Sequence, residues 1–303
     1  MDSEFTLIGA PSSAGAHAPG QEKAPASLRQ AGIFECFALA GLSVADKGDL
    51  PGFRYRTDPD SPLARNVKDV VTNAKNVADF VAETLEGGRK YIVLGGDCTN
   101  GVGAINGATR DTNIKTGVIY LDMHGDLNTP QTVSSGALDW MGVAHLLGAD
   151  GTIPAYANLE GRSPVLQNDQ IVLLGWDYHG SNSDSEREAI IRRRLSVVFL
   201  DELQTDAEAA AKRALQLLGP VDRVVVHFDV DVIDFAECPL GESYRHGQGC
   251  TLAQAMTALS TIASNPEFSG VTVAELNPDH GEEHLATLKR FSTAFADALA
   301  GKL

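Results

Sequence analysis

Short runs of β-branched and other apolar residues recur along this chain, and segments with helical periodicity separate many of them. We expect strands at eight places: Phe5–Gly9, Val44–Lys47, Tyr91–Leu94, Gly117–Leu121, Ile171–Leu174, Val197–Leu200, Val221–Val230 and Val271–Ala274. Strands that alternate with helices in this way predict an α/β fold, with one largely parallel sheet covered by helices on both faces. No stretch has the composition of an interdomain linker, so we expect a single domain over residues 1–303.

Composition and charge exclude several classes of protein. The net charge of −16 argues against nucleic-acid or anionic-membrane partners, and it suits a cationic small-molecule substrate. The four cysteines show no close pairing, which argues against a disulfide framework or a zinc ribbon. The sequence contains neither a signal-peptide pattern nor an apolar run long enough to span a membrane, so we expect a soluble, cytoplasmic protein.

The strand expected at Gly117–Leu121 ends in three polar residues at alternate positions. Asp122, His124 and Asp126 would point the same way in extended backbone, so that two carboxylates and an imidazole converge. Such a set at the end of a parallel strand favours a divalent-metal site, since ligands collect at that edge in α/β folds. A polar loop capped by Asp and Asn is the alternative.

Two other expected strands also end in acids. Asp229 and Asp231 follow the run at 221–230, and Glu275 follows the run at 271–274. Carboxylates held close together repel one another unless a cation lies between them. The combination therefore predicts a pair of divalent ions that share bridging carboxylates.

Over nearly its whole length the chain resembles the arginase/agmatinase (ureohydrolase) superfamily. The motifs that carry this resemblance are Leu-Ile-Gly-Ala-Pro at 7–11, Leu-Gly-Gly-Asp at 94–97, Asp-Met-His-Gly-Asp-Leu-Asn-Thr-Pro at 122–130, Phe-Asp-Val-Asp at 228–231 and Ala-Glu-Leu-Asn-Pro at 274–278. The resemblance implies a three-layer α/β/α fold with a mainly parallel eight-stranded sheet, in homo-oligomers that are usually trimers or hexamers. It also implies hydrolysis of a guanidine or formimino C–N bond by a hydroxide that bridges two Mn²⁺ ions.

Matched position by position, the resemblance assigns the metal ligands. Asp122 and Asp229 match the bridging carboxylates, Asp126 matches a ligand of the first metal, and His124 and Asp231 match ligands of the second. Asp126 also matches the residue that orients the attacking hydroxide. Glu275 matches the acid that pairs with the substrate guanidinium, in the planar geometry of a bidentate ion pair.

One departure from the family pattern affects the first metal. The family motif Gly-Gly-Asp-His-Ser reads Gly-Gly-Asp-Cys-Thr at 95–99, so Cys98 stands where the family has a histidine ligand. A thiolate suits zinc better than manganese, so the first site would be weak, differently occupied or empty. The alternative is that Cys98 is a small buried residue and not a ligand. We therefore expect one or two Mn²⁺ ions per chain.

A second departure affects proton transfer. Asp139 occupies the place of the histidine that shuttles protons to the leaving amine in arginases, and Trp140 follows it in place of a glycine. Asp139 is a candidate acid or base if its pKa is raised. His145 is a second candidate, although a single histidine on a helix more often has a structural role.

The loop after residue 126 favours an arginine-like substrate. Asn128 and Ser135 match positions that hold the α-amino-acid end of the substrate in arginases, and Glu186 matches an acid near the substrate amine. Ala137 lacks a polar side chain, so a third polar contact with the amino-acid end of the substrate is missing. In its cysteine at position 98 and its missing shuttle histidine, the chain resembles the branch of the family that converts Nω-hydroxy-L-arginine to hydroxyurea and ornithine. The alternatives are a hydrolase of another guanidino or amidino compound and a non-catalytic binding protein.

Overall fold

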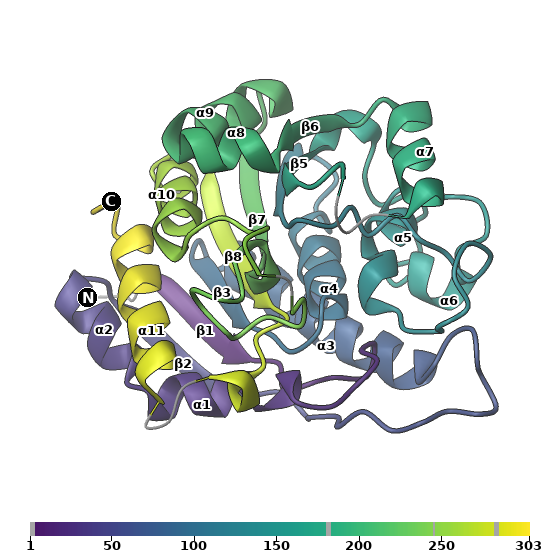
Figure 1. Ribbon diagram of the computed structural model, residues 1–303, viewed down its shortest axis with the longest axis horizontal. Helices are drawn as coiled ribbons and strands as arrows, with labels where there is room; N and C mark the ends of the chain where they lie inside the picture. Colours follow the sequence, from purple (N-terminus) through teal and green to yellow (C-terminus); the bar gives the residue numbers. More distant parts are fainter. Residues whose placement is uncertain (1–3, 180–182, 245, 282–284) are drawn as a thin grey trace.

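The computed structural model describes residues 4–179, 183–244, 246–281 and 285–303, and its centre is an eight-stranded sheet (Figure 1). The strands are β1 Phe5–Gly9, β2 Val44–Asp49, β3 Lys90–Leu94, β4 Thr116–Leu121, β5 Ile171–Trp176, β6 Ser196–Phe199, β7 Arg223–Asp229 and β8 Phe268–Ala274. Their order across the sheet is β2-β1-β3-β8-β7-β4-β5-β6, and every neighbouring pair is parallel. The expected eight-stranded parallel sheet is therefore confirmed.

Helices cover both faces of this sheet, which gives the three-layer α/β/α arrangement (Figure 1). One face carries α1 Ala24–Gln30, α2 Ile33–Ala40, α8 Leu200–Thr205, α9 Ala207–Leu218, α10 Leu252–Ala263 and α11 Ala286–Leu299. The other carries α3 Val67–Glu86, α4 Thr99–Ala108, α5 Gly142–Leu146 and α6 Pro154–Ala157, with α7 Asp184–Arg193 at its edge. In the described part of the chain, no helix is both long enough and apolar enough to cross a membrane.

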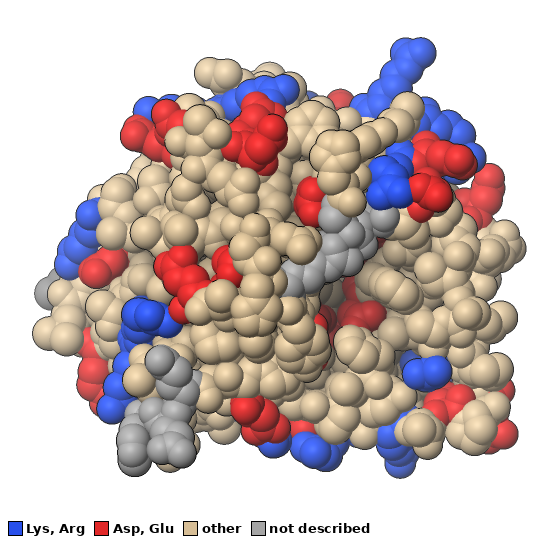
Figure 2. Space-filling view, viewed as in Figure 1, with Lys and Arg blue, Asp and Glu red and all other residues tan. Residues whose placement is uncertain are grey.

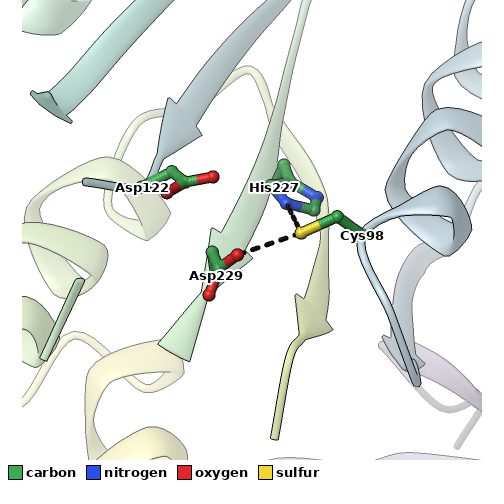
Figure 3. A group of neighbouring side chains, drawn as sticks. All are labelled: Cys98, Asp122, His227 and Asp229. Carbon is green, nitrogen blue, oxygen red and sulfur yellow. Dashed lines mark hydrogen bonds between the residues drawn. The ribbon is translucent and has the colours of Figure 1, made fainter. Parts of the chain in front are cut away.

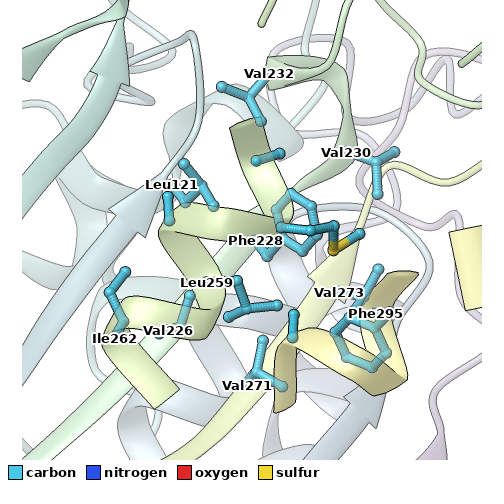
Figure 4. Close-up of a cluster of buried hydrophobic side chains, with 14 of the residues drawn as sticks. Leu121, Val226, Phe228, Val230, Val232, Leu259, Ile262, Val271, Val273 and Phe295 are labelled. Carbon is cyan, nitrogen blue, oxygen red and sulfur yellow. The ribbon is translucent and has the colours of Figure 1, made fainter. Parts of the chain in front are cut away.

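The side chains of each central strand alternate between two hydrophobic cores. On β4, Ile119 and Leu121 belong to the core beneath α9, α10 and α11, whereas Val118 and Tyr120 belong to the core beneath α3 and α4. Figure 4 shows part of the first core, where Leu121 and Phe228 lie among apolar side chains of the helix layer. Burial on both faces explains why these strands read as continuous apolar runs rather than as alternating ones.

The strand order brings the polar strand ends together. β3, β8, β7 and β4 are consecutive in the middle of the sheet, although they are far apart in sequence. Because all of them run in the same direction, the segments that follow them leave from one edge. These segments carry Cys98, Asp122, Asp229 and Glu275, so the sheet alone places the four residues at one site.

Candidate metal centre and active site

Each of the four central strands delivers one acid or thiol to this edge. Cys98 is the N-cap residue of α4, just after β3, and Asp122 directly follows β4. Asp229 is the last residue of β7, and Glu275 directly follows β8. All four side chains are buried, between 1% and 5% exposed.

Possible ligand atoms converge in two groups that share Asp122. The first consists of Cys98, Asp122, His227 and Asp229, and the second of Asp122, His124 and Asp231; within each group the atoms lie within 4.8 Å of one another. In the second group, His124 Nδ1 lies 3.4 Å from Asp122 Oδ1 and 3.3 Å from Asp231 Oδ2. The expected clustering of Cys98, Asp122, His124, Asp229 and Asp231 is thus present.

The chemistry of these groups fits a divalent cation. Asp122 Oδ2 and Asp231 Oδ1 are buried without a hydrogen-bond partner among the described residues. Burial raises the pKa of Asp122 to about 6. Burial, and then the charge of Asp231, raises the pKa of Asp229 well above its usual value. Carboxylates in such positions are costly to ionise unless a positive charge is bound between them.

Two residues of the site are held in a backbone conformation that L-amino acids rarely adopt. Asp126 has φ 51° and Glu275 has φ 59°. Strain of this kind persists where the surrounding structure enforces it, and it is concentrated at functional sites. The hydroxyl of Tyr120 donates a hydrogen bond of 2.5 Å to Asp126 Oδ2. The Glu275 carboxylate accepts bonds from the Cys98 backbone N–H at 2.7 Å and from Gln21 Nε2 at 3.2 Å.

Members of both ligand groups, together with Asp126 and Glu275, border a cavity of about 500 Å³ that opens to solvent. The described residues that line it are His17, Cys98, His124, Asp126, Ser135, Ala137, Asp139, Trp140, Asp229, Asp231, Glu242, Ser243 and Glu275. Figure 2 shows acidic side chains recessed within a hollow of this face. Among the described lining residues there are many carboxylates and neither Lys nor Arg, which favours a cationic ligand.

Several residues proposed from the sequence occupy different parts of this arrangement. Ser135 and Asp139 line the cavity, and so does Asp126, although its carboxylate belongs to neither ligand group. Asn128 and Glu186 are buried beside each other and are not among the described lining residues. Glu186 Oε1 accepts a bond from the Leu127 N–H at 2.9 Å, and Asn128 Nδ2 lies 3.5 Å from it. Their roles in substrate binding stay predictions.

His145 has a structural position. It is fully buried, and Nε2 accepts a bond from the Ile153 N–H at 2.9 Å while Nδ1 bonds the Met141 carbonyl at 2.7 Å. Burial lowers its pKa to about 4. Both ring nitrogens of His145 thus make hydrogen bonds to the backbone, and the residue is not among the described residues that line the cavity.

Sequence reasoning missed two histidines. His227 stands two positions before Asp229 on β7, so strand alternation was a signal that could have placed it on the same side. His17 comes from the loop after β1, and its Nδ1 lies 3.9 Å from Asp139 Oδ2 at the cavity wall. The neighbouring Asp139 carboxylate raises the pKa of His17, although burial opposes this. No sequence spacing links His17 to Asp139, because the contact is purely tertiary.

The fold and the site together define a class: three-layer α/β/α proteins with an acidic metal centre at the carboxyl edge of a parallel sheet. The sequence profile of the Arginase family matches residues 3–300. The chain belongs to the arginase family and is a hydrolase of that family with a candidate metal site.

Individual relatives agree with this assignment. Human arginase-1 is 31% identical over 300 residues, which cover 97% of this chain and 91% of that protein. The arginase structure from Bacillus caldovelox superposes with a TM-score of 0.86 at 25% identity and covers 98% of both chains. A formiminoglutamase from Trypanosoma cruzi, solved with Mn²⁺, has a TM-score of 0.75 at 19% identity, over 99% of this chain and 93% of the other. That last likeness shows a shared fold only.

Proposed function

We propose that this protein hydrolyses a guanidine C–N bond of an arginine-like substrate. Arginine would give urea and ornithine, and Nω-hydroxy-L-arginine would give hydroxyurea and ornithine. The observation that carries the proposal is the position of Glu275, a buried carboxylate in the wall of the same cavity as the two ligand groups. A guanidinium paired with Glu275 would place its carbon beside the metal centre, and such a planar cation suits a carboxylate.

The residues of the cavity divide the remaining tasks. Asp126 lines the cavity and accepts a hydrogen bond from the hydroxyl of Tyr120, and in this proposal its carboxylate would orient a water molecule and accept its proton. Asp139, with His17 beside it, would return a proton to the leaving amine. Ser135 offers a hydroxyl to the polar end of the substrate.

We further propose that divalent ions, one or two per chain, are held by the two ligand groups, with Mn²⁺ at Asp122, His124 and Asp231. Oxygen-rich sets with one imidazole suit this ion. When bound, such ions supply a nucleophile at neutral pH by lowering the pKa of water. The trimer or hexamer expected from the family resemblance stays a prediction.

A non-catalytic binding protein is the alternative from another class. Against it stand the retained acids Asp122, Asp126, Asp229, Asp231 and Glu275, all 6% exposed or less. A chain that no longer bound metal would keep five buried carboxylates at a cost in stability and without a purpose.

The test is a product assay for urea, hydroxyurea and ornithine over a panel of guanidino and formimino compounds, with and without added Mn²⁺. We expect ornithine from arginine or from Nω-hydroxy-L-arginine, loss of it in Asp126→Asn, and retention in Asp150→Asn, an exposed acid outside the cavity. Turnover of a formimino compound alone would refute the substrate assignment. Absence of turnover over the whole panel in metal-loaded protein would favour the binding protein.

A further inference from the structure

The first ligand group contains sulfur and nitrogen as well as oxygen. Cys98 Sγ lies 3.2 Å from His227 Nε2 and 3.0 Å from Asp229 Oδ2, and Asp122 completes the group (Figure 3). Cys98 and the three other members are each no more than 2% exposed. They come from three different segments: the start of α4, the end of β7 and the residue after β4.

Hydrogen bonds within this group leave buried polar atoms unpaired. The thiol has one proton to donate and donates it to Asp229 Oδ2. Asp122 Oδ2 and His227 Nδ1 have no partner among the described residues. An unpaired buried carboxylate oxygen that faces a thiol and an imidazole is costly, and a cation bound between them would remove that cost.

The His227 ring is packed on one face and at one edge. The Tyr120 ring stacks on the face, with 4.1 Å between centroids and 17° between planes. Gly101 of α4 lies at the edge around Nδ1, where an added Cβ would come within 2.6 Å of His227 Cε1 and closer still to Nδ1. Positions 98 and 101 share one face of the helix. The thiol of Cys98 and the absent side chain at Gly101 therefore both leave room for this imidazole.

We propose that His227 takes over the role of a metal ligand beside Cys98, so that this half of the centre selects a thiophilic divalent cation, Zn²⁺, Co²⁺ or Fe²⁺, over Mn²⁺. A thiolate and an imidazole are softer ligands than carboxylates, and they favour these ions. Binding releases the thiol proton to solvent. The other half, with Asp122, His124 and Asp231, keeps the harder set. The inference rests on the metal centre of the proposed function and not on the identity of the substrate.

Cobalt absorption tests this assignment without any turnover. Metal-free full-length protein is titrated with Co²⁺, and the sulfur-to-cobalt charge-transfer band in the near ultraviolet is recorded. We expect the band in the wild-type protein and its loss in Cys98→Ser. Cys250→Ser removes a buried thiol that lies outside the site and should keep the band. Failure of the band to appear at any Co²⁺ ratio, or its survival in Cys98→Ser, would overturn the assignment of the thiolate.

Two further variants isolate the histidine. His227→Gln should weaken Co²⁺ binding at the band-forming site by more than the roughly 10–100-fold that loss of an outer-shell partner costs. His124→Ala, in the other half of the centre, should leave the band in place. Circular dichroism confirms that each variant is folded. An unchanged Co²⁺ affinity in folded His227→Gln would show that His227 is not a ligand.

Competition between metals tests the selectivity. Metal-free protein dialysed against equal Zn²⁺ and Mn²⁺ should retain more Zn²⁺ per chain than Cys98→Ser, because a thiolate adds to the preference for Zn²⁺ that oxygen and nitrogen ligands already have. Equal Zn²⁺ content in the wild type and in Cys98→Ser would refute the claim. Since none of these readouts uses a substrate, they can succeed if the guanidine assay fails, and the reverse also holds.

Discussion

Substitution of Gly101 by alanine tests how closely helix α4 approaches His227. The new methyl group would lie 2.6 Å from His227 Cε1, far inside van der Waals contact. The stack with Tyr120 limits how far the imidazole can tilt to relieve this contact. Removal of the ring in His227→Ser should abolish the clash, so the effect of Gly101→Ala should depend on the residue at position 227.

Two opposing contributions set the expected change in the free energy of unfolding of Gly101→Ala. Insertion of a methyl group into a packed core costs about 1–3 kcal/mol. Replacing glycine by alanine within a helix contributes up to about 1 kcal/mol in the other direction. The helix term is the same in both backgrounds and cancels in a double-mutant cycle. The coupling free energy between positions 101 and 227 should therefore equal the clash, about 1–3 kcal/mol.

The assay is urea unfolding of the metal-free protein at one fixed protein concentration, for the wild type, both single variants and the double variant. Gly103→Ala is the matched control on the same helix. An added Cβ there would lie 2.9 Å from Ala74 Cα, on α3. The change in the free energy of unfolding that Gly103→Ala causes should therefore be additive with that of His227→Ser. A coupling below about 0.5 kcal/mol at position 101 is within ordinary additivity and would refute this packing.

Three further predictions follow from the same site. Cys98→His should bind Mn²⁺ in the first ligand group only when it is combined with His227→Ser. The reason is that Cys98 Sγ already lies 3.2 Å from His227 Nε2, which leaves no room for a second imidazole. Calorimetry that finds one extra Mn²⁺ bound by the single variant would contradict this. Glu275→Gln should lower kcat/KM at least about thirtyfold, since loss of one partner of a buried ion pair costs about 2–5 kcal/mol, and unchanged steady-state kinetics would exclude the proposed contact. Burial raises the pKa of Asp97 and of Glu186 to about 7, so the folded protein binds protons that the unfolded chain releases. The contribution of these two groups to the free energy of unfolding of metal-free protein should thus be largest at low pH and fall as pH rises toward about 7. The fall should be up to about 1.4 kcal/mol for each unit of pKa shift. Urea unfolding that shows constant or rising stability over this range would contradict the predicted direction of the pH dependence.

The sequence by itself determined the sheet and which strand ends carry most of the acids of the candidate site. Strands buried on both faces read as apolar runs, and the acids at 122, 229 and 275 follow these runs directly. Because all strands of a parallel sheet end at one edge, strand-end acids can be assigned to one site before their neighbours are known. The family motifs depend on the same local spacing, and the sequence profile confirmed the family that they indicate.

Only the tertiary structure decided which side chains stand around Cys98. The His227 ring reaches the thiol because α4, which Cys98 caps, packs against β7 and has a glycine at 101, and neither fact can be read from spacing along the chain. The pairing of His17 with Asp139 depends in the same way on how the loop after β1 folds over the cavity. Local patterns specify the direction of a side chain within its own element. Contacts between elements depend on strand order and close packing, which the whole chain sets together.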